Sequence, residues 1–224
     1  PYGWPGDAVD GGVQVLLVAG LIRALDERHQ TIDPNDLERK AIGTTMFKVE
    51  SATVSAAQRI QIRKVLQKVG LTARQGEELA SVPQFLANAQ ELAKRAGGDA
   101  PSPARPDTQM LEEIRLTAGN EQLLALYNQR DELSDSIDVW KATADRIDKR
   151  LPAWNTLKRL LAQANGLSGA EVLVAQVTHL AQQRQLLEEP DPFPLLVASL
   201  KQLMRAELNR LHTEYQTRHK NGLP

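Results

Sequence analysis

The sequence predicts a mainly α-helical protein, with a small winged-helix-like N-terminal region of short strands followed by a long-helix bundle or coiled coil. Aromatic residues make up only 4% of the chain, so the core must consist mainly of Leu, Val, Ile and Ala, which commonly fill helix–helix interfaces. Short β-branched segments occur within the first 50 residues, whereas apolar residues recur at helical spacing beyond residue 100.

The N-terminal region is expected to alternate short helices with short strands. Asp7 or Asp10 is a candidate cap for a first helix that Gly20 ends, and Asp33 followed by Pro34 is typical of a second helix start. The remaining expected elements are strands at residues 21–25, 31–32 and 44–49, with a turn at 26–30.

Two longer helices are predicted next, at residues 55–69 and 81–96. The apolar side of the first is expected to comprise Ile60, Ile62, Val65, Leu66 and Val69. Two glycines and three prolines in residues 97–106 cannot continue a helix. We therefore predict an α+β region at residues 1–96, a linker or surface loop at 97–108, and a helical bundle or coiled coil at 109–224.

Apolar residues in the C-terminal part recur at alternating spacings of four and three, which is typical of a heptad seam. The seam comprises Leu133, Ile137, Trp140, Ala144, Ile147, Leu151 and Trp154. Pro152 lies inside it, so the helix is expected to kink or restart there. Ser168 is a candidate cap for the next helix, and the proline-rich residues 189–194 precede the last one. The seam either forms the core of a bundle within the chain or binds a partner or a second copy.

No pattern of catalytic, metal-binding or nucleotide-binding residues is recognisable. The chain has no phosphate-loop motif and no cysteine, and its four histidines do not occur as pairs at metal-ligand spacing. Adjacent glutamates such as Glu77 and Glu78 point in different directions on a helix, so their spacing alone forms no acid–base pair. We expect no enzymatic activity, cofactor or metal in this segment.

One segment is basic enough to suggest nucleic-acid binding. Residues 51–76 contain five basic side chains and no acidic one: Arg59, Arg63, Lys64, Lys68 and Arg74. On a winged-helix-like frame such a helix could contact DNA phosphates. The alternative interpretation is an ordinary exposed face, or one that pairs with acidic residues such as Glu77 and Glu78.

The opening segment resembles a known family. Residues 2–10 read Tyr-Gly-Trp-Pro-Gly-Asp-Ala-Val-Asp, and Val15-Leu16-Leu17 and Gly20 to Ala24 follow. This motif is similar to one in the large P-loop ATPase-like proteins of bacterial BREX phage-defence systems, of the BrxC/PglY type. The similarity is looser along the helical remainder, where Leu151 to Trp154 also contribute.

The resemblance implies a fragment of a much longer cytoplasmic protein whose ATP site lies outside this segment. None of the family's ATP-binding residues matches a position in this chain. The expected function is assembly, through self-association or through binding of other BREX proteins. The alternative is a DNA-binding regulator that uses the helix around residues 59–68. We expect no membrane contact, because the longest apolar run, at residues 15–22, is too short to cross a bilayer.

Overall fold

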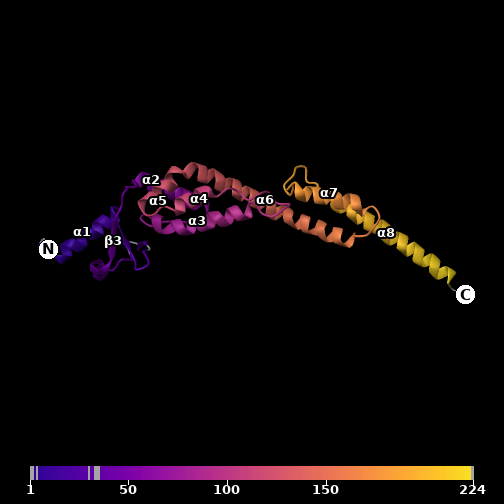
Figure 1. Cartoon of the computed structure of the whole chain (residues 1–224), viewed down its shortest axis with the longest axis horizontal. Helices are drawn as coiled ribbons and strands as arrows, with labels where there is room; N and C mark the ends of the chain where they lie inside the picture. Colours follow the sequence, from indigo (N-terminus) through magenta and orange to yellow (C-terminus); the bar gives the residue numbers. More distant parts are fainter. Residues whose placement is uncertain (1–2, 4, 30, 33–35, 223–224) are drawn as a thin grey trace. The chain divides into compact units, whose positions relative to one another are not determined.

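The computed structural model describes residues 3, 5–29, 31–32 and 36–222. It confirms the predicted class, because short strands lie near the N-terminus and long helices follow (Figure 1). In chain order the elements are α1 (Gly6–Val18), β1 (Ile22–Leu25), β2 (Thr31–Ile32), the 3-10 helix η1 (Arg39–Thr44), β3 (Met46–Val49), α2 (Ala56–Lys68), α3 (Glu78–Arg95), α4 (Gln109–Arg115), α5 (Asn120–Asn128), α6 (Arg130–Gln163), α7 (Ala170–Gln182) and α8 (Phe193–Asn221).

The described chain divides into two compact units. The first comprises Pro1–Ala93 with Asp107–Val139, and the second comprises Lys94–Pro106 with Trp140–Pro224. The helix α6 contributes to both units, because its residues lie on either side of position 139. The domain division predicted around residues 97–108 stays a prediction.

The small sheet in the first unit has the strand order β2–β1–β3, and both pairings are antiparallel. Its central residue is Ala24, which pairs with Ile32 on one side and with Phe47 on the other. Ala24 is fully buried in a cluster with Leu17 of α1 and with Ile42 of η1. The sheet is therefore covered by the short helices that the sequence places on either side of β1 and β2.

The caps of the first helix differ from the prediction. Pro5 precedes α1 and no side chain caps it, so the assignment of Asp7 or Asp10 as the cap was wrong; Asp7 lies in the first turn. The Pro5 carbonyl accepts hydrogen bonds from the amides of Ala8 and Val9, which closes that turn without a side chain. Gly20 follows the helix with a φ of +71°, as expected of a glycine that ends a helix.

The predicted helix start at Asp33 and Pro34 lies outside the described residues. The strand expected at residues 44–49 is shorter, because Thr44 belongs to η1 and β3 begins at Met46.

The helix α2 confirms the prediction closely. Ser55 caps it through a reciprocal pair of hydrogen bonds with Gln58. Ile62 and Leu66 are buried as expected, but Ile60 is exposed. At 100° per residue, Ile60 lies about 200° from Ile62, so it cannot share the buried stripe.

The helix α6 continues through Pro152 without a break, so the helix does not restart at this residue, and the kink that was the other expectation stays a prediction. Ile147, Trp154 and Leu157, on both sides of the proline, belong to one buried apolar cluster. Their packing outweighs the loss of one backbone hydrogen bond. The assignment of Ser168 as the cap of α7 was also wrong. The residue that precedes this helix is Gly169, whose backbone is in the left-handed conformation, and no side chain caps the helix.

Residues 97–106 form a loop whose backbone carbonyls accept several hydrogen bonds. The Gly98 amide donates to the Pro103 carbonyl at 2.9 Å, and Arg184 Nη1 donates to the carbonyls of Gly98 (2.6 Å) and Ser102 (3.0 Å). A Cβ on Gly97 would lie 2.3 Å from the carbonyl oxygen of Ala104, so this position requires glycine. The loop is thus an ordered part of the second unit.

Replacing Pro152 by Ala should stabilise the chain, because alanine restores a helical amide and removes the clash one turn back. We expect the free energy of unfolding to rise by about 1–3 kcal/mol, measured by urea denaturation with circular dichroism at 222 nm. The control is Pro194→Ala in the first turn of α8, where the missing amide would have no helical partner. Equal effects at the two positions would contradict this explanation.

Candidate functional site

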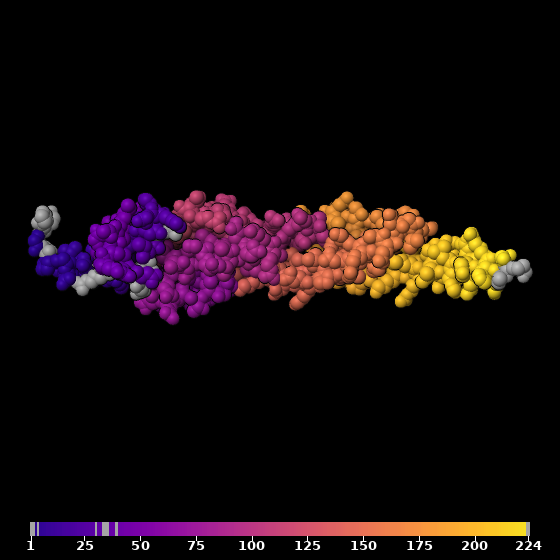
Figure 2. Space-filling model, turned by 90° about the horizontal axis from the view of Figure 1, so that it is seen from below, coloured from indigo at the N-terminus to yellow at the C-terminus, as the bar shows by residue number. Residues whose placement is uncertain are grey.

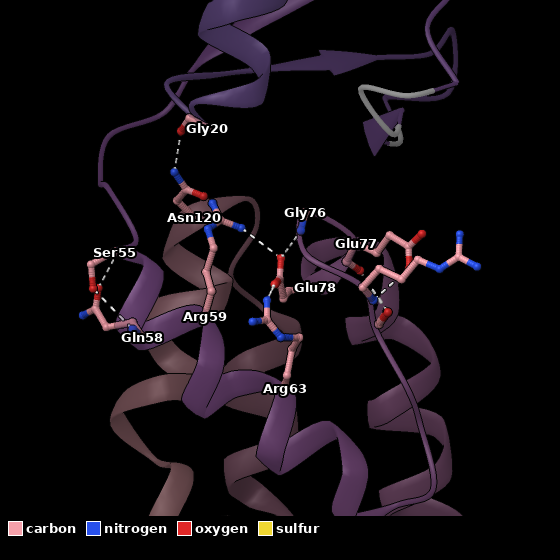
Figure 3. A network of polar contacts seen from close by, with 11 residues as sticks. Gly20, Ser55, Gln58, Arg59, Arg63, Gly76, Glu77, Glu78 and Asn120 are labelled. Carbon is pink, nitrogen blue, oxygen red and sulfur yellow. Dashed lines mark hydrogen bonds and ion pairs between the residues drawn. The ribbon is translucent and has the colours of Figure 1, made fainter.

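The basic helix α2 turns two of its arginines toward a buried carboxylate. Glu78, the first residue of α3, has a fully buried side chain. Arg59 Nη1 lies 3.3 Å from Glu78 Oε2, and Arg63 Nη1 contacts Glu78 Oε1 (Figure 3). The Gly76 amide donates to the same carboxylate at 2.9 Å. Because burying a carboxylate is costly unless it is paired and hydrogen-bonded, this cluster fixes α2 against the start of α3.

The five basic residues singled out in the sequence therefore have different roles. Arg59 and Arg63 are mostly buried in the pair with Glu78, which confirms the alternative that this helix pairs with an acidic residue. Lys68 forms an ion pair with Asp138 of α6. Lys64 and Arg74 are exposed. The structure thus brings Arg59 and Arg63 together around one acid and leaves Lys64 and Arg74 as the solvent-facing cations of the group.

A second polar cluster joins segments that are distant in sequence. Asn120 is buried at the start of α5, and its Nδ2 donates to the carbonyls of Gly20 (2.6 Å, Figure 3) and Ala52 (2.8 Å). The backbone amide of Asn120 donates to Glu50 Oε2 at 2.9 Å, and Glu50 Oε1 lies 3.6 Å from Arg23 Nε. These contacts attach the loops that flank the small sheet to α5.

The sequence analysis missed Glu50 and Asn120. Gly119, with a φ of +66°, is the only local signal: a Cβ there would lie 2.3 Å from Glu50 Oε1. A glycine immediately before a helix is common, so this signal is not specific.

A cavity of about 220 Å³ lies between these two clusters. Its polar wall includes Arg23, Glu50, Arg59 and Asn120, and its apolar wall includes Leu17, Ile22, Ile32, Leu79 and Leu123. The charged groups on the wall already form ion pairs with one another or with Glu78. The cavity therefore offers paired charges rather than a nucleophile with an adjacent base.

The residues of the predicted seam are mostly buried. Leu133 and Ile137 belong to the first unit, and Trp140, Ala144, Ile147 and Trp154 belong to the second. Leu151 differs, because 37% of it is exposed. Since burial within the single chain already occupies the other positions, α6 presents little of its seam to a partner.

Large apolar side chains are exposed on several other helices, among them α1 and α8. On α1, Val15 (67% exposed) and Val18 (72%) stand three residues apart and so share a face. On α8, Leu208 (67%), Leu211 (48%) and Tyr215 (66%) are exposed along its C-terminal half. Periodicity shows which residues of a helix share a face but not what covers that face, so the sequence alone could not identify these faces as exposed.

Within the described part of the chain, no group of three or more potential ligand side chains is arranged to hold a metal ion. None of the helices in that part combines the length and the apolar character needed to cross a membrane.

Comparison of the chain with protein-family models, with curated proteins and with solved structures finds no match. The site is therefore interpreted from its own geometry.

Replacing Glu78 by Gln should destabilise the first unit, because two mostly buried guanidinium groups would lose their counter-charge. We expect a loss of about 2–3 kcal/mol in the free energy of unfolding, measured by urea denaturation. The matched control is Glu77→Gln, since the Glu77 side chain is only partly buried and accepts a hydrogen bond from the Arg74 amide. If both variants lose the same stability, Glu78 does not have the role described here.

Proposed function

We propose that this chain is an assembly segment of a BREX phage-defence ATPase-like protein, which associates with itself and binds other protein components of the same system. In this proposal the chain has no catalytic role, and ATP binds elsewhere in a longer cytoplasmic protein. The opening motif and its resemblance support the family. The exposed apolar faces of α1 and α8 support an interaction role.

The face of α1 is the observation that carries this proposal. Gly6 to Val18 falls within residues 2–25, where the resemblance is sharpest, yet only Leu17 of this helix is buried. Val15 and Val18 are among the most exposed apolar residues of the described chain. Solvent-exposed apolar faces of this kind are typical of protein–protein contacts.

The exposed residues of α1 indicate what kind of surface it fits. Val15 and Val18 are apolar, so a complementary partner would present an apolar groove. In this proposal the partner is another protein component of the defence system.

Replacing Val15 by Glu should weaken this contact without unfolding the chain, because the side chain is exposed. When the chain is co-expressed with the other proteins of its defence operon and purified by affinity, we expect the recovered partner to fall at least fivefold. The control is Gly6→Glu, which adds the same charge to the same helix about 180° around from Val15, where a new side chain meets open space. Unchanged recovery with Val15→Glu, or no partner with the unmodified chain, would contradict the proposal.

DNA binding through α2 stays the alternative prediction, and the structure shows how to test it without disturbing the fold. Lys64 and Arg74 are exposed, whereas Arg59 and Arg63 stabilise Glu78. If the alternative holds, Lys64→Ala combined with Arg74→Ala should weaken binding of duplex DNA in an electrophoretic mobility shift at low salt by roughly tenfold. The alternative is wrong if the unmodified chain shifts no DNA under these conditions.

A further inference from the structure

The cavity in the first unit is bounded by both exposed and buried residues. Thr31 and Ala80 line it and are exposed, whereas Asn120 and Leu123 line it and are buried. The lining comes from α1, β1, β2, α2, α3 and α5, all of which belong to the first unit. In Figure 2 the indigo and purple residues of α1 and the small sheet lie directly against the magenta helices of this unit. The cavity is therefore open to solvent at an edge and closed by packed residues at its base.

The polar wall of the cavity has hydrogen-bonding capacity that the fold does not use. Arg23 Nε is buried and has no hydrogen-bond acceptor among the described residues. Glu50 Oε1 lies 3.6 Å from it, which is beyond hydrogen-bonding distance. Because a buried donor without an acceptor costs free energy, an anionic oxygen at this wall would be stabilised.

The second arginine of the wall lies close to a glycine. Arg59 reaches Glu78 through Nη1, next to Asn120 (Figure 3). A Cβ on Gly20 would lie 2.9 Å from Arg59 Nη2 and 3.7 Å from Asn120 Nδ2. The absence of a side chain at Gly20 therefore leaves space beside both nitrogens, at a position that also lines the cavity.

The charged cluster at this wall has an excess of one positive charge. Its guanidinium groups are those of Arg23, Arg59 and Arg63. Its carboxylates are only those of Glu50, which pairs with one arginine, and Glu78, which two arginines share. One negative charge would therefore neutralise the cluster. A carboxylate carries that charge at neutral pH, whereas a phosphate monoester carries about 1.5 to 2.

The apolar wall and the volume limit the size of a ligand. The cavity measures about 220 Å³, which corresponds to about seven water molecules at roughly 30 Å³ each. Pockets for drug-sized ligands are larger, at about 300–1,000 Å³. A molecule of about seven or eight non-hydrogen atoms therefore fits, and a nucleotide does not. Leu17, Ile22, Ile32, Leu79 and Leu123 provide apolar contacts for such a molecule.

We propose that this cavity binds a small monocarboxylate with a short apolar chain. Its carboxylate accepts hydrogen bonds from Arg23 and Arg59, and its chain packs against the apolar wall. Guanidinium groups bind carboxylates through charge-assisted hydrogen bonds, and small-molecule sites typically combine an apolar lining with a few convergent polar groups. Ligand binding of this kind is separate from the proposed assembly role and does not rest on the faces of α1 and α8.

The charge requirement is tested with two probes of equal shape. Hexanoate is a monocarboxylate of about eight non-hydrogen atoms, and hexanamide matches it but carries no charge. In an NMR titration of the full chain, hexanoate should bind with a dissociation constant of about 0.1–1 mM. Hexanamide should bind at least about tenfold more weakly, because it leaves the excess positive charge unmatched. No binding of hexanoate at about 10 mM, or equal binding of the two probes, would overturn the inference.

The location is tested by filling the cavity from its exposed edge. Ala80→Phe adds an aromatic ring at an exposed position of α3 that lines the cavity, and it leaves the charged cluster intact. The matched control is Ala87→Phe, about two turns further along the same helix, where the residue is also exposed but is not part of the lining.

We expect Ala80→Phe to weaken hexanoate binding at least tenfold and Ala87→Phe to leave it unchanged, with the same helical content by circular dichroism. Thr31→Phe, at an exposed position of β2 that also lines the cavity, serves the same purpose if Ala80→Phe does not fold. If the filled variant and the control bind hexanoate equally, the ligand does not occupy this cavity and the inference is wrong.

Discussion

The fully buried Glu78 carboxylate must be neutralised, and this requirement constrains how α2 packs against the start of α3 in the first unit. A carboxylate without solvent requires counter-charge and hydrogen-bond donors, and here α2 supplies two guanidinium groups while the Gly76 amide supplies a third donor. Because Arg59 and Arg63 are four residues apart on α2, both reach Glu78 in only one rotation of that helix. The same rotation buries Ile62 and Leu66 and exposes Ile60.

This constraint changes the meaning of the basic segment. Considered as a linear pattern, residues 51–76 form an uncompensated positive run. In the folded chain Glu78 neutralises part of it from just outside the run, and Asp138 pairs with Lys68 from 70 residues away. The basic residues that form these ion pairs contribute to the fold. The proposed interaction role is therefore better supported by the apolar faces of α1 and α8 than by the basic face of α2.

Those two faces differ in extent. The α1 face is short and apolar, with Val15 and Val18 exposed. The α8 face extends over a longer part of its helix and includes Leu208, Leu211 and Tyr215.

The sequence by itself determined the elements whose signals are local. A helix was predicted to start at residue 55, Gly20 was predicted to end the first helix, and the three short strands were predicted close to their observed positions. These succeed because capping and turn chemistry act between residues a few positions apart.

Only the tertiary structure decided which surfaces are covered. Pro152 stays helical because buried residues on both sides of it pack into one core, and the buried Glu78 carboxylate is paired with arginines of α2. Most of the residues at heptad spacing in α6 are buried, whereas Leu208, Leu211 and Tyr215, at similar spacing near the end of α8, are exposed. Periodicity is a property of one helix, but burial depends on segments that are distant in the chain, so no local pattern could separate the two cases.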